Sequence, residues 1–437
     1  MIKIGTKGLG VFAACSLLAS SLPYAVNADA KSLNDISGHW AAQAINTAVD
    51  KGYVDGYPDG TFKPESKVTR AEFLSLLLKA LKVAPAPGAG NDWYVPYVNT
   101  AVTCGIHKYE DFTTGDWNSA LTRYEMARLT ARAALGQQNQ DDKKWMYLAT
   151  KAGLINGLDD TGTLGEDQTT TRAQAITIIE RVLKIAAGEK LPWDKHAVSR
   201  AEVAWHGTNV FTMWPRYFDE KNIGKFDISN FQWAAADGKY SEKVLNFTVV
   251  DMEDPNDPFR AEVEGMQFEF LDWRSGSQDL FYSKATSNSY VTFSKIQQNI
   301  TGSYPGGFNF SFGGTVSVSK IVPEEIMNHM DNSWEKNYEK QADGQQVEYS
   351  KLFTGMPQIE WHKAHGHNPG YVKDMPKEGG TFYWYSAQLH PKGDYFSAVK
   401  NLMNISYGPS TEYQLKVGPK SRGVSFTGYT NYDVKNP

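Results

Sequence analysis

Apolar residues recur at helical spacing in three stretches of the first half of the chain. In the first stretch Phe73, Leu76, Leu77, Ala80 and Leu81 fall at positions i, i+3, i+4, i+7 and i+8, which puts them on one face of a helix. The two later stretches repeat this pattern with Met126, Leu129, Thr130, Ala133 and Ala134, and with Ala175, Ile178, Ile179, Val182 and Leu183. Each stretch therefore predicts an amphipathic helix.

These helices belong to a unit that recurs along the chain. A shift of 53 residues places the sequence Asn-Thr-Ala-Val of 46–49 on the same four residues at 99–102, and a shift of 101 to 102 residues adds a third copy. Each copy reads as helix, loop, helix. Because repeats of this length bury their apolar faces on their neighbours, we expect three helical repeats, at 31–84, 91–137 and 141–187, around one shared core.

The periodicity changes after the third repeat. Residues 188–195 predict a linker through Gly188 and Pro192, and from about His196 the pattern shifts to alternation, as in 308–312 and 267–270. Further strand candidates are 244–250, 290–293, 316–319, 381–385 and 423–426, and one helix is expected at 323–338. We therefore expect 196–437 to form a β-rich, sandwich-like α+β domain.

The amino terminus has the pattern of a secretory signal peptide. Lys3 and Lys7 precede an apolar run over 9–26 that ends in small residues, which predicts a leader at 1–30. No later stretch of about 20 apolar residues occurs, so we expect no membrane span. The net charge of -5, with both signs interspersed, argues against a nucleic-acid partner. The 12 tryptophans supply flat surfaces for core packing or for stacking on sugar rings.

A short polar motif precedes each of the three apolar stripes. Thr69-x-x-Glu72 and Thr122-x-x-Glu125 match a capping box, in which the Thr hydroxyl and the Glu carboxylate each accept from the other residue's backbone N–H. Thr171-x-x-Gln174 keeps the pattern with a neutral amide. The motifs predict where the three helices begin.

An arginine follows the threonine in every copy of the motif. Arg70, Arg123 and Arg172 occupy the first helical position, where the helix dipole makes a cation unfavourable by roughly 0.3–1 kcal/mol. One interpretation is an anion site, formed by free N–H groups of the helix terminus and a guanidinium. The other is that each arginine pairs with an acidic residue of a neighbouring repeat or lays its stem over the core. The residues leave both interpretations open.

Three segments of the first repeat together resemble a known family. Asp35-Ile36-x-x-His39-Trp40-Ala41, the loop Gly-Tyr-Pro-Asp-Gly-Thr-Phe at 56–62 and the tetrad Thr-Arg-Ala-Glu at 69–72 closely resemble the surface-layer homology (SLH) domain. The resemblance covers about 31–187. It implies a three-pronged, pseudo-threefold helical bundle that anchors the chain non-covalently to a secondary cell-wall polysaccharide carrying a pyruvate ketal. It also implies a secreted protein in the cell wall or surface layer of a Gram-positive-type bacterium.

The resemblance also implies binding residues. In the family the tetrad arginine meets the ketal carboxylate, while the tryptophan and the Gly-rich loop contribute to grooves between the prongs. Carried over by position, the polysaccharide-binding residues are Arg70, Glu72, Trp40, Gly60, Arg123, Glu125, Trp93, Arg172 and Gln174. The second repeat has His-Lys-Tyr-Glu-Asp at 107–111 in place of the Gly-rich loop, and the third has Asp141 or Asp142 where tryptophan would fall. Whether all three grooves bind is therefore open.

Two clusters beyond the repeats offer metal ligands. Asp251, Glu253, Asp254 and Asp257 suit calcium or form ordinary turns, and His362, His365 and His367 suit a transition metal or form a solvated loop. Apart from calcium, no cofactor is expected.

No catalytic motif appears in the sequence, and we therefore expect no enzyme and no catalytic residues. The favoured interpretation of 196–437 is a structural or adhesive outer domain, with self-association in a surface array as a further expectation. The alternative is an envelope- or polysaccharide-acting hydrolase, whose paired carboxylates can lie far apart in sequence.

Overall fold

A computed structural model describes most of the first half of the chain and parts of the second. The described residues are 33–86, 92–112, 115–136, 140–215, 218–234, 238–265, 267–272, 279–284, 289–301, 315–318, 356–357, 379–391, 403–407 and 424–427. The expected leader at 1–30, the strand at 308–312, the helix at 323–338 and the three clustered histidines (His362, His365 and His367) lie outside these residues. The chain divides into two compact units, Met1–Ala201 and Glu202–Pro437.

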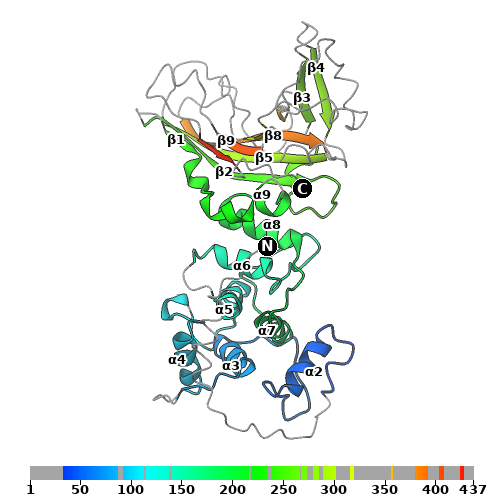
Figure 1. Cartoon of the computed structure of the whole chain (residues 1–437), viewed down its shortest axis with the longest axis vertical. Coiled ribbons are helices and arrows are strands. Elements are labelled where there is room, and N and C mark those ends of the chain that lie inside the picture. Colours follow the sequence, from blue (N-terminus) through cyan, green and yellow to red (C-terminus); the bar gives the residue numbers. More distant parts are fainter. Residues whose placement is uncertain are drawn as a thin grey trace, which may run out of the picture. The chain divides into compact units, whose positions relative to one another are not determined.

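The described part of the first unit is helical. Its helices are α2 (Ala42–Asp50), α3 (Arg70–Ala80), α4 (Val95–Thr103), α5 (Arg123–Leu135), α6 (Lys144–Lys151) and α7 (Arg172–Ala186), with a short 3-10 turn η1 (Tyr109–Asp111) (Figure 1). The first helix of each repeat packs on the second helix of another repeat: α4 on α3, α6 on α5, and α2 on α7. The predicted stripes form the core, since Phe73, Leu77 and Met126 are fully buried.

The loops that precede α3, α5 and α7 link the repeats in a ring. Isolated β-bridges join Thr69 to Ala120, Thr122 to Thr169, and Lys67 to Thr171. Each bridge connects the segment before one repeat's second helix to the corresponding segment of another repeat. The start of every second helix is therefore held by backbone from a different repeat, and this is where the arginines lie.

The described strands of the second unit form three antiparallel sheets. Strand order is β1-β2-β5-β8 in the largest sheet, β10-β9-β6 in the second and β4-β3-β7 in the third. The strands are β1 (Gln232–Ala234), β2 (Tyr240–Asp251), β3 (Gln267–Asp272), β4 (Asp279–Lys284), β5 (Ser289–Thr301), β6 (Thr315–Val318), β7 (Met356–Pro357), β8 (Gly379–Pro391), β9 (Met403–Tyr407) and β10 (Val424–Thr427). The strands expected at 244–250, 267–270, 290–293 and 381–385 lie within β2, β3, β5 and β8.

Helical segments precede the strands, contrary to the expectation that alternation begins at His196. They are α8 (Lys195–His206), α9 (Val210–Met213) and the 3-10 turns η2 (Glu220–Lys225) and η3 (Ile228–Asn230). A further short helix, α10 (Arg260–Val263), follows β2. Asp194 begins α8, because its Oδ1 accepts from the backbone N–H of His196 at 2.9 Å and of Ala197 at 3.1 Å. None of the helices in the described segments is long and apolar enough to cross a membrane.

Candidate functional site: the junctions between repeats

The three helix starts that carry the arginines are capped as the sequence predicts. The hydroxyls of Thr69, Thr122 and Thr171 each accept from the backbone N–H three residues on. In return Glu72 Oε2 accepts from Thr69 N at 2.8 Å, and Gln174 Oε1 from Thr171 N at 3.1 Å. Glu125 Oε2 does the same for Thr122 N at 3.0 Å. The capping boxes are confirmed, and Glu72, Glu125 and Gln174 are all engaged in them.

The first two N–H groups of each helix are also engaged. In α3 the Arg70 N–H donates to Ser119 O at 3.1 Å and the Ala71 N–H to Trp117 O at 3.0 Å. The equivalent bonds run from Arg123 to Gln168, from Tyr124 to Glu166, from Arg172 to Ser66 and from Ala173 to Pro64. The assumption of free N–H groups at these helix ends is therefore wrong, because carbonyls of another repeat occupy them.

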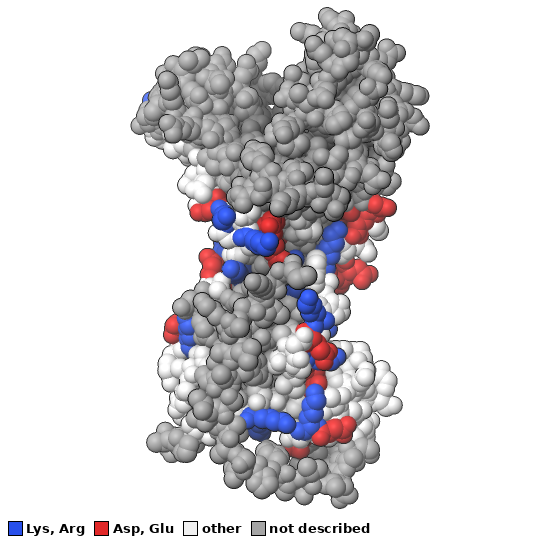
Figure 2. Space-filling model, viewed as in Figure 1, with Lys and Arg blue, Asp and Glu red and all other residues white. Residues whose placement is uncertain are grey.

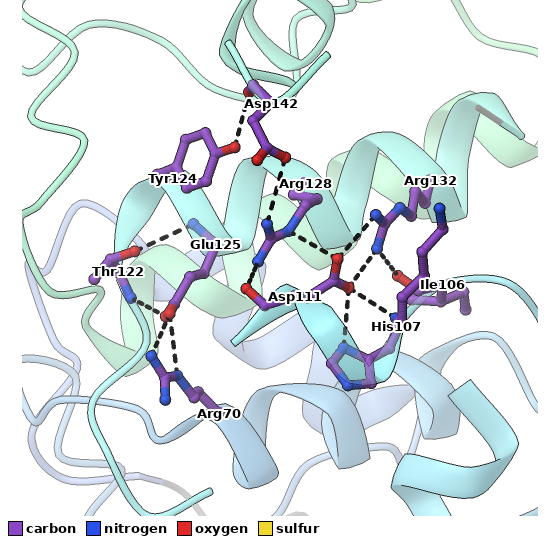
Figure 3. A network of polar contacts seen from close by, with 11 residues as sticks. Arg70, Ile106, His107, Asp111, Thr122, Tyr124, Glu125, Arg128, Arg132 and Asp142 are labelled. Atoms are coloured by element: carbon purple, nitrogen blue, oxygen red, sulfur yellow. Dashed lines mark hydrogen bonds and ion pairs between the residues drawn. The ribbon is translucent and has the colours of Figure 1, made fainter. Parts of the chain in front are cut away.

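At the junction of the first and second repeats, the tetrad arginine has an acidic partner. Arg70 Nε lies 3.1 Å from Glu125 Oε1, and its Nη2 contacts the same oxygen (Figure 3). Its Nη1 donates to Asp116 O at 3.2 Å, and the guanidinium lies 4.4 Å from the ring centroid of Phe112. Only 5% of Arg70 is exposed. This is the internal ion pair that the sequence left open as one alternative.

Beside this pair, one carboxylate contacts two arginines and a histidine of the second repeat. Asp111 Oδ1 accepts from Arg132 Nη2 at 3.0 Å and lies 3.5 Å from Arg128 Nε (Figure 3). His107 Nδ1 lies 3.1 Å from Asp111 Oδ2, and all four side chains are buried. Burial alone raises the pKa of Asp111, yet hydrogen bonds from His107 and Arg132 outweigh it and hold the pKa well below its usual range. The loop that replaces the Gly-rich sequence is thus an ionic cluster.

At the junction of the second and third repeats, Arg123 is satisfied by backbone. Its Nε donates to Leu164 O and its Nη2 to Asn156 O, each at 2.8 Å, and only 5% of the residue is exposed. Burial, and then the nearby Arg181, lower the pKa of Arg123. Among the described residues no carboxylate lies within ion-pair distance of Arg123. Gln174, which stands where the other two tetrads carry glutamate, supplies no charge here.

The loop of the third repeat is covered by the segment that starts α8. Asp194 Oδ2 accepts from Gly157 N at 2.9 Å, and Arg200 Nε donates to Thr161 O at 2.9 Å. The ring of His196 contacts Asp160 O at 2.6 Å. Gly162 has φ +73°, and a Cβ added there would lie 2.3 Å from the backbone nitrogen of Ala197. This close approach leaves no room at Gly162 for a side chain or for a ligand.

The junction of the third and first repeats is different. Arg172 is partly exposed, and its Nε donates to Phe62 O at 3.1 Å. Its guanidinium carbon lies 5.1 Å from the ring centroid of Tyr57 and 4.7 Å from that of Phe62. Within the described residues, neither terminal nitrogen of Arg172 has a hydrogen-bond partner. The guanidinium is therefore held in place by one bond and two rings, with two nitrogens available.

A second cation lies at the same ring. Lys63 Nζ is 4.1 Å from the centroid of Tyr57 and 3.5 Å from Asp59 Oδ2. Lys63 has φ +57°, and Asp35 Oδ2 fixes this unfavourable conformation by accepting from the Lys63 N–H at 2.8 Å. The sequence did not reveal that Tyr57 contacts Arg172 or that Lys63 lies at the same ring, although the Gly-rich loop that holds Tyr57 belongs to the family resemblance.

The remaining predicted binding residues are two exposed tryptophans and one loop glycine. Trp40 is 62% exposed and Trp93 is 53% exposed, whereas Gly60 adopts φ +79° in the loop of the first repeat. On the face of the molecule shown in Figure 2, blue Lys and Arg side chains alternate with red Asp and Glu side chains. The described residues on this face thus form no broad field of one sign, so local geometry decides where an anion is favoured there.

Carboxylates of the acidic cluster at 251–257 accept hydrogen bonds from backbone N–H groups of the same segment. Asp257 Oδ2 accepts from Asp251 N at 2.8 Å and Oδ1 from Phe259 N at 2.9 Å. Asp251 Oδ1 accepts from Glu253 N at 3.0 Å, and Asp254 Oδ1 from Asn256 N at 2.9 Å. Burial raises the pKa of Asp257 to about 6. In the described segments no three His, Cys, Asp or Glu side chains converge as a metal site requires.

Comparison with known proteins points to the same region. The profile of the S-layer homology domain matches residues 32–74. The cellulosome-anchoring protein of Acetivibrio thermocellus is 49% identical over 83 residues, which are 19% of this chain and 17% of that protein. The exoglucanase XynX of Acetivibrio thermocellus is 28% identical over 204 residues, covering 41% of this chain and 18% of the relative.

A surface-layer protein shows similar coverage. The surface-layer 125 kDa protein of Lysinibacillus sphaericus is 27% identical over 203 residues, which are 41% of this chain and 17% of the relative. The chain spans less than a fifth of the length of each of these three relatives. Names such as anchoring protein, exoglucanase and surface-layer protein therefore describe much longer chains that share a limited region with this one.

Proposed function

We propose that the S-layer homology domain carried by this cell-surface chain at 32–74 is the first unit of a three-repeat, three-pronged anchor. The anchor binds a secondary cell-wall polysaccharide and holds the unit that follows at the wall. The recurrence of the capped helix start at Arg70, Arg123 and Arg172, and the ring of β-bridges between repeats, support a pseudo-threefold arrangement.

Arg172 is the residue that receives the acidic substituent of the polymer, a pyruvate ketal. A carboxylate accepts two parallel hydrogen bonds from a guanidinium, and Arg172 has two terminal nitrogens available for them within the described residues. Tyr57 and Phe62 fix the plane of the guanidinium, and Lys63 adds a second positive charge at the same ring. The assignment of the ketal carboxylate to Arg172 rests on these two terminal nitrogens, which have no hydrogen-bond partner within the described residues.

The other two tetrad arginines have structural roles. Arg70 is neutralised by Glu125, and Arg123 is engaged by carbonyls beneath a loop that α8 covers. Opening either junction to a carboxylate requires breaking bonds that already exist. The three junctions therefore differ in ligand binding, and weaker contacts elsewhere on a repetitive polymer still add avidity.

Binding of the full chain to purified wall polymer, with and without its ketal, tests this assignment. Arg172→Ala should lose most of the affinity gained from the ketal, whereas Arg172→Lys keeps the charge without the fork and should lose part of it. Lys190→Ala, which removes an exposed lysine after the third repeat, is the matched control. If Arg172→Ala binds the ketal-bearing polymer as tightly as the unaltered chain, the carboxylate does not bind at this junction.

For the second unit we propose a structural or adhesive role, with self-association in a surface array. Its described strands form antiparallel sheets, and a sandwich is the packing we propose for them. The competing proposal, a wall-acting hydrolase, predicts that 202–437 releases sugars or peptides from purified wall. Turnover by the full chain that disappears when an acidic pair of this unit is replaced would establish the hydrolase instead.

A further inference from the structure

The largest sheet of the second unit has two edges, and one of them is closed. On this side β1 pairs with β2 over 241–243. Beyond β1 the Phe247 N–H donates to Gly207 O at 2.7 Å. The buried side chain of Asn209 then bonds Val249 in both directions, because its Oδ1 accepts from Val249 N at 2.7 Å and its Nδ2 donates to Val249 O at 2.8 Å. This side of the sheet is therefore covered by a short strand and by 207–209.

The other edge is formed by β8, which is 13 residues long, whereas strands usually have about 5–6. It pairs with β5 along its whole length without a bulge, although β5 and β2 change register between Val244 and Asn246. Within the described residues, no strand, bridge or backbone hydrogen bond lies on the other side of β8. The strands β6 and β7 come near β8 but do not pair with it. In this part of the chain the sheet thus ends in a long, regular strand.

The sequence of β8 lacks the features that usually keep edge strands apart. Natural edge strands avoid pairing with other chains by being short, by carrying charged side chains, especially Lys, by an interior Pro, or by a bulge. The segment 379–391 contains no Lys, Arg, Asp or Glu, and its only proline is the last residue. All five residues of 381–385 are β-branched or aromatic, the types that favour strands. β8 is therefore suited to accept a further strand.

The first part of β8 lies at the surface. Gly380 and Thr381 are exposed, and Tyr383 is 41% exposed, whereas Ala387 is buried. Thr381 Oγ1 donates to Asn299 Oδ1 of β5 at 2.9 Å. Lys295 of β5 places its Nζ 5.1 Å from the ring centroid of Tyr383. These contacts hold β8 from the β5 side, and the part of β8 accessible to another chain is 379–383.

We propose that the outer edge of β8 pairs antiparallel with the β8 edge of a second copy of this chain. Two identical edges related by a twofold axis satisfy each other's backbone groups in one closed contact. A strand without charged residues can lie beside its own copy with no like charges opposed. This inference deepens the proposed self-association of the second unit and rests on it. It does not depend on the wall polysaccharide.

Sedimentation of the full chain over a range of concentrations, without wall polymer, tests the pairing. The unaltered chain should form dimers. Thr381→Lys and Tyr383→Glu each place a charge on the edge strand and should weaken dimerisation by at least about tenfold. The glutamate at 383 can still contact Lys295, so the sheet itself is retained. Gln232→Lys places a charge at an exposed position of β1, on the closed side of the same sheet, and is the matched control. Thermal unfolding verifies that the variants remain folded.

Amide hydrogen exchange locates the contact independently. Amides of 379–383 should exchange more slowly at concentrations where the unaltered chain is dimeric than where it is monomeric. Self-association that Thr381→Lys and Tyr383→Glu leave unchanged, or that does not slow exchange in β8, overturns the β8 pairing and leaves the proposed self-association intact. An unaltered chain that stays monomeric overturns both. Neither result affects the assignment of the wall polymer to Arg172, which is measured by polymer binding.

Discussion

The second repeat and the Arg172 junction use the same residue type in opposite ways. In and beside the second repeat, Arg70, Arg128 and Arg132 are buried and share two buried carboxylates, Glu125 and Asp111. At the junction of the third and first repeats, Arg172 is partly exposed and has rings and one carbonyl as neighbours. Arginines at the same position of different repeats therefore have different roles, because the neighbouring repeat determines what each side chain contacts.

The largest effect is expected at Asp111. Asp111→Asn keeps the shape but removes the charge that two buried arginines share, and this should cost about 3–5 kcal/mol of unfolding free energy. Because the pKa of Asp111 in the folded protein lies below its ordinary value, its contribution is present above about pH 4 and is lost as the pH falls further. Urea unfolding between pH 7 and pH 2 should show the two proteins converging in acid. A constant difference would contradict the ionic role.

A smaller loss is expected at Glu125. Glu125→Gln keeps the capping box, as Gln174 does in the third repeat, but leaves Arg70 with a neutral partner. The expected cost is about 2 kcal/mol, since a hydrogen bond to a charged group is weakened without being removed. Denaturant unfolding measures it. Glu72→Gln is the matched control, because Glu72 forms the equivalent cap but pairs with no arginine within the described residues. If both substitutions lower the unfolding free energy equally, the ion pair between Arg70 and Glu125 adds no stability.

Two glycines test whether the covered loop differs from the open one. Gly60→Ala and Gly162→Ala both place a side chain at positive φ, which should cost about 1–2 kcal/mol each. Gly162→Ala also drives its Cβ against the first turn of α8, and this should add about 1–3 kcal/mol. At Gly60 the nearest such contact is Asn34 at 3.4 Å. Equal losses in thermal unfolding would show that α8 does not constrain the third loop.

The smallest effect on stability is expected at Arg172. Arg172→Ala removes one hydrogen bond to a carbonyl and two ring contacts, and about 1 kcal/mol of unfolding free energy should be lost. A loss as large as that of Asp111→Asn would mean that Arg172 is also a structural residue. The comparison between the second repeat and this junction would then no longer hold.

Local features of the helical unit could be predicted from the sequence, and contacts between repeats could not. The capping boxes at Thr69, Thr122 and Thr171 depend on residues three positions apart, so the motif alone predicts them. The pairing of Arg70 with Glu125 joins residues 55 positions apart, and it depends on which repeat lies beside which. The repeat alignment showed equivalence between copies but not that α3, α5 and α7 each begin on another copy's loop.

The start of α8 was missed although the sequence carries a signal for it. Asp194 two residues after Pro192 is a helix-start pattern, and Ala197, Val198 and Ala201 follow at helical spacing and are buried. The alternating pattern farther along the chain does not reach back to His196, which lies in α8. In the second unit, strands over 244–250 and 290–293 were predictable because long alternating runs pair as β2 and β5.

The covering of the third loop by 194–200 has a practical consequence for protein display on cell walls. A cargo fused directly after the last repeat, at 187, removes the Asp194 acceptor of Gly157 and the Arg200 donor to Thr161. A passenger joined after α8, which ends at His206, keeps both bonds and therefore receives an anchor whose last loop is still closed. The better fusion site therefore lies after α8 and not at the end of the third repeat.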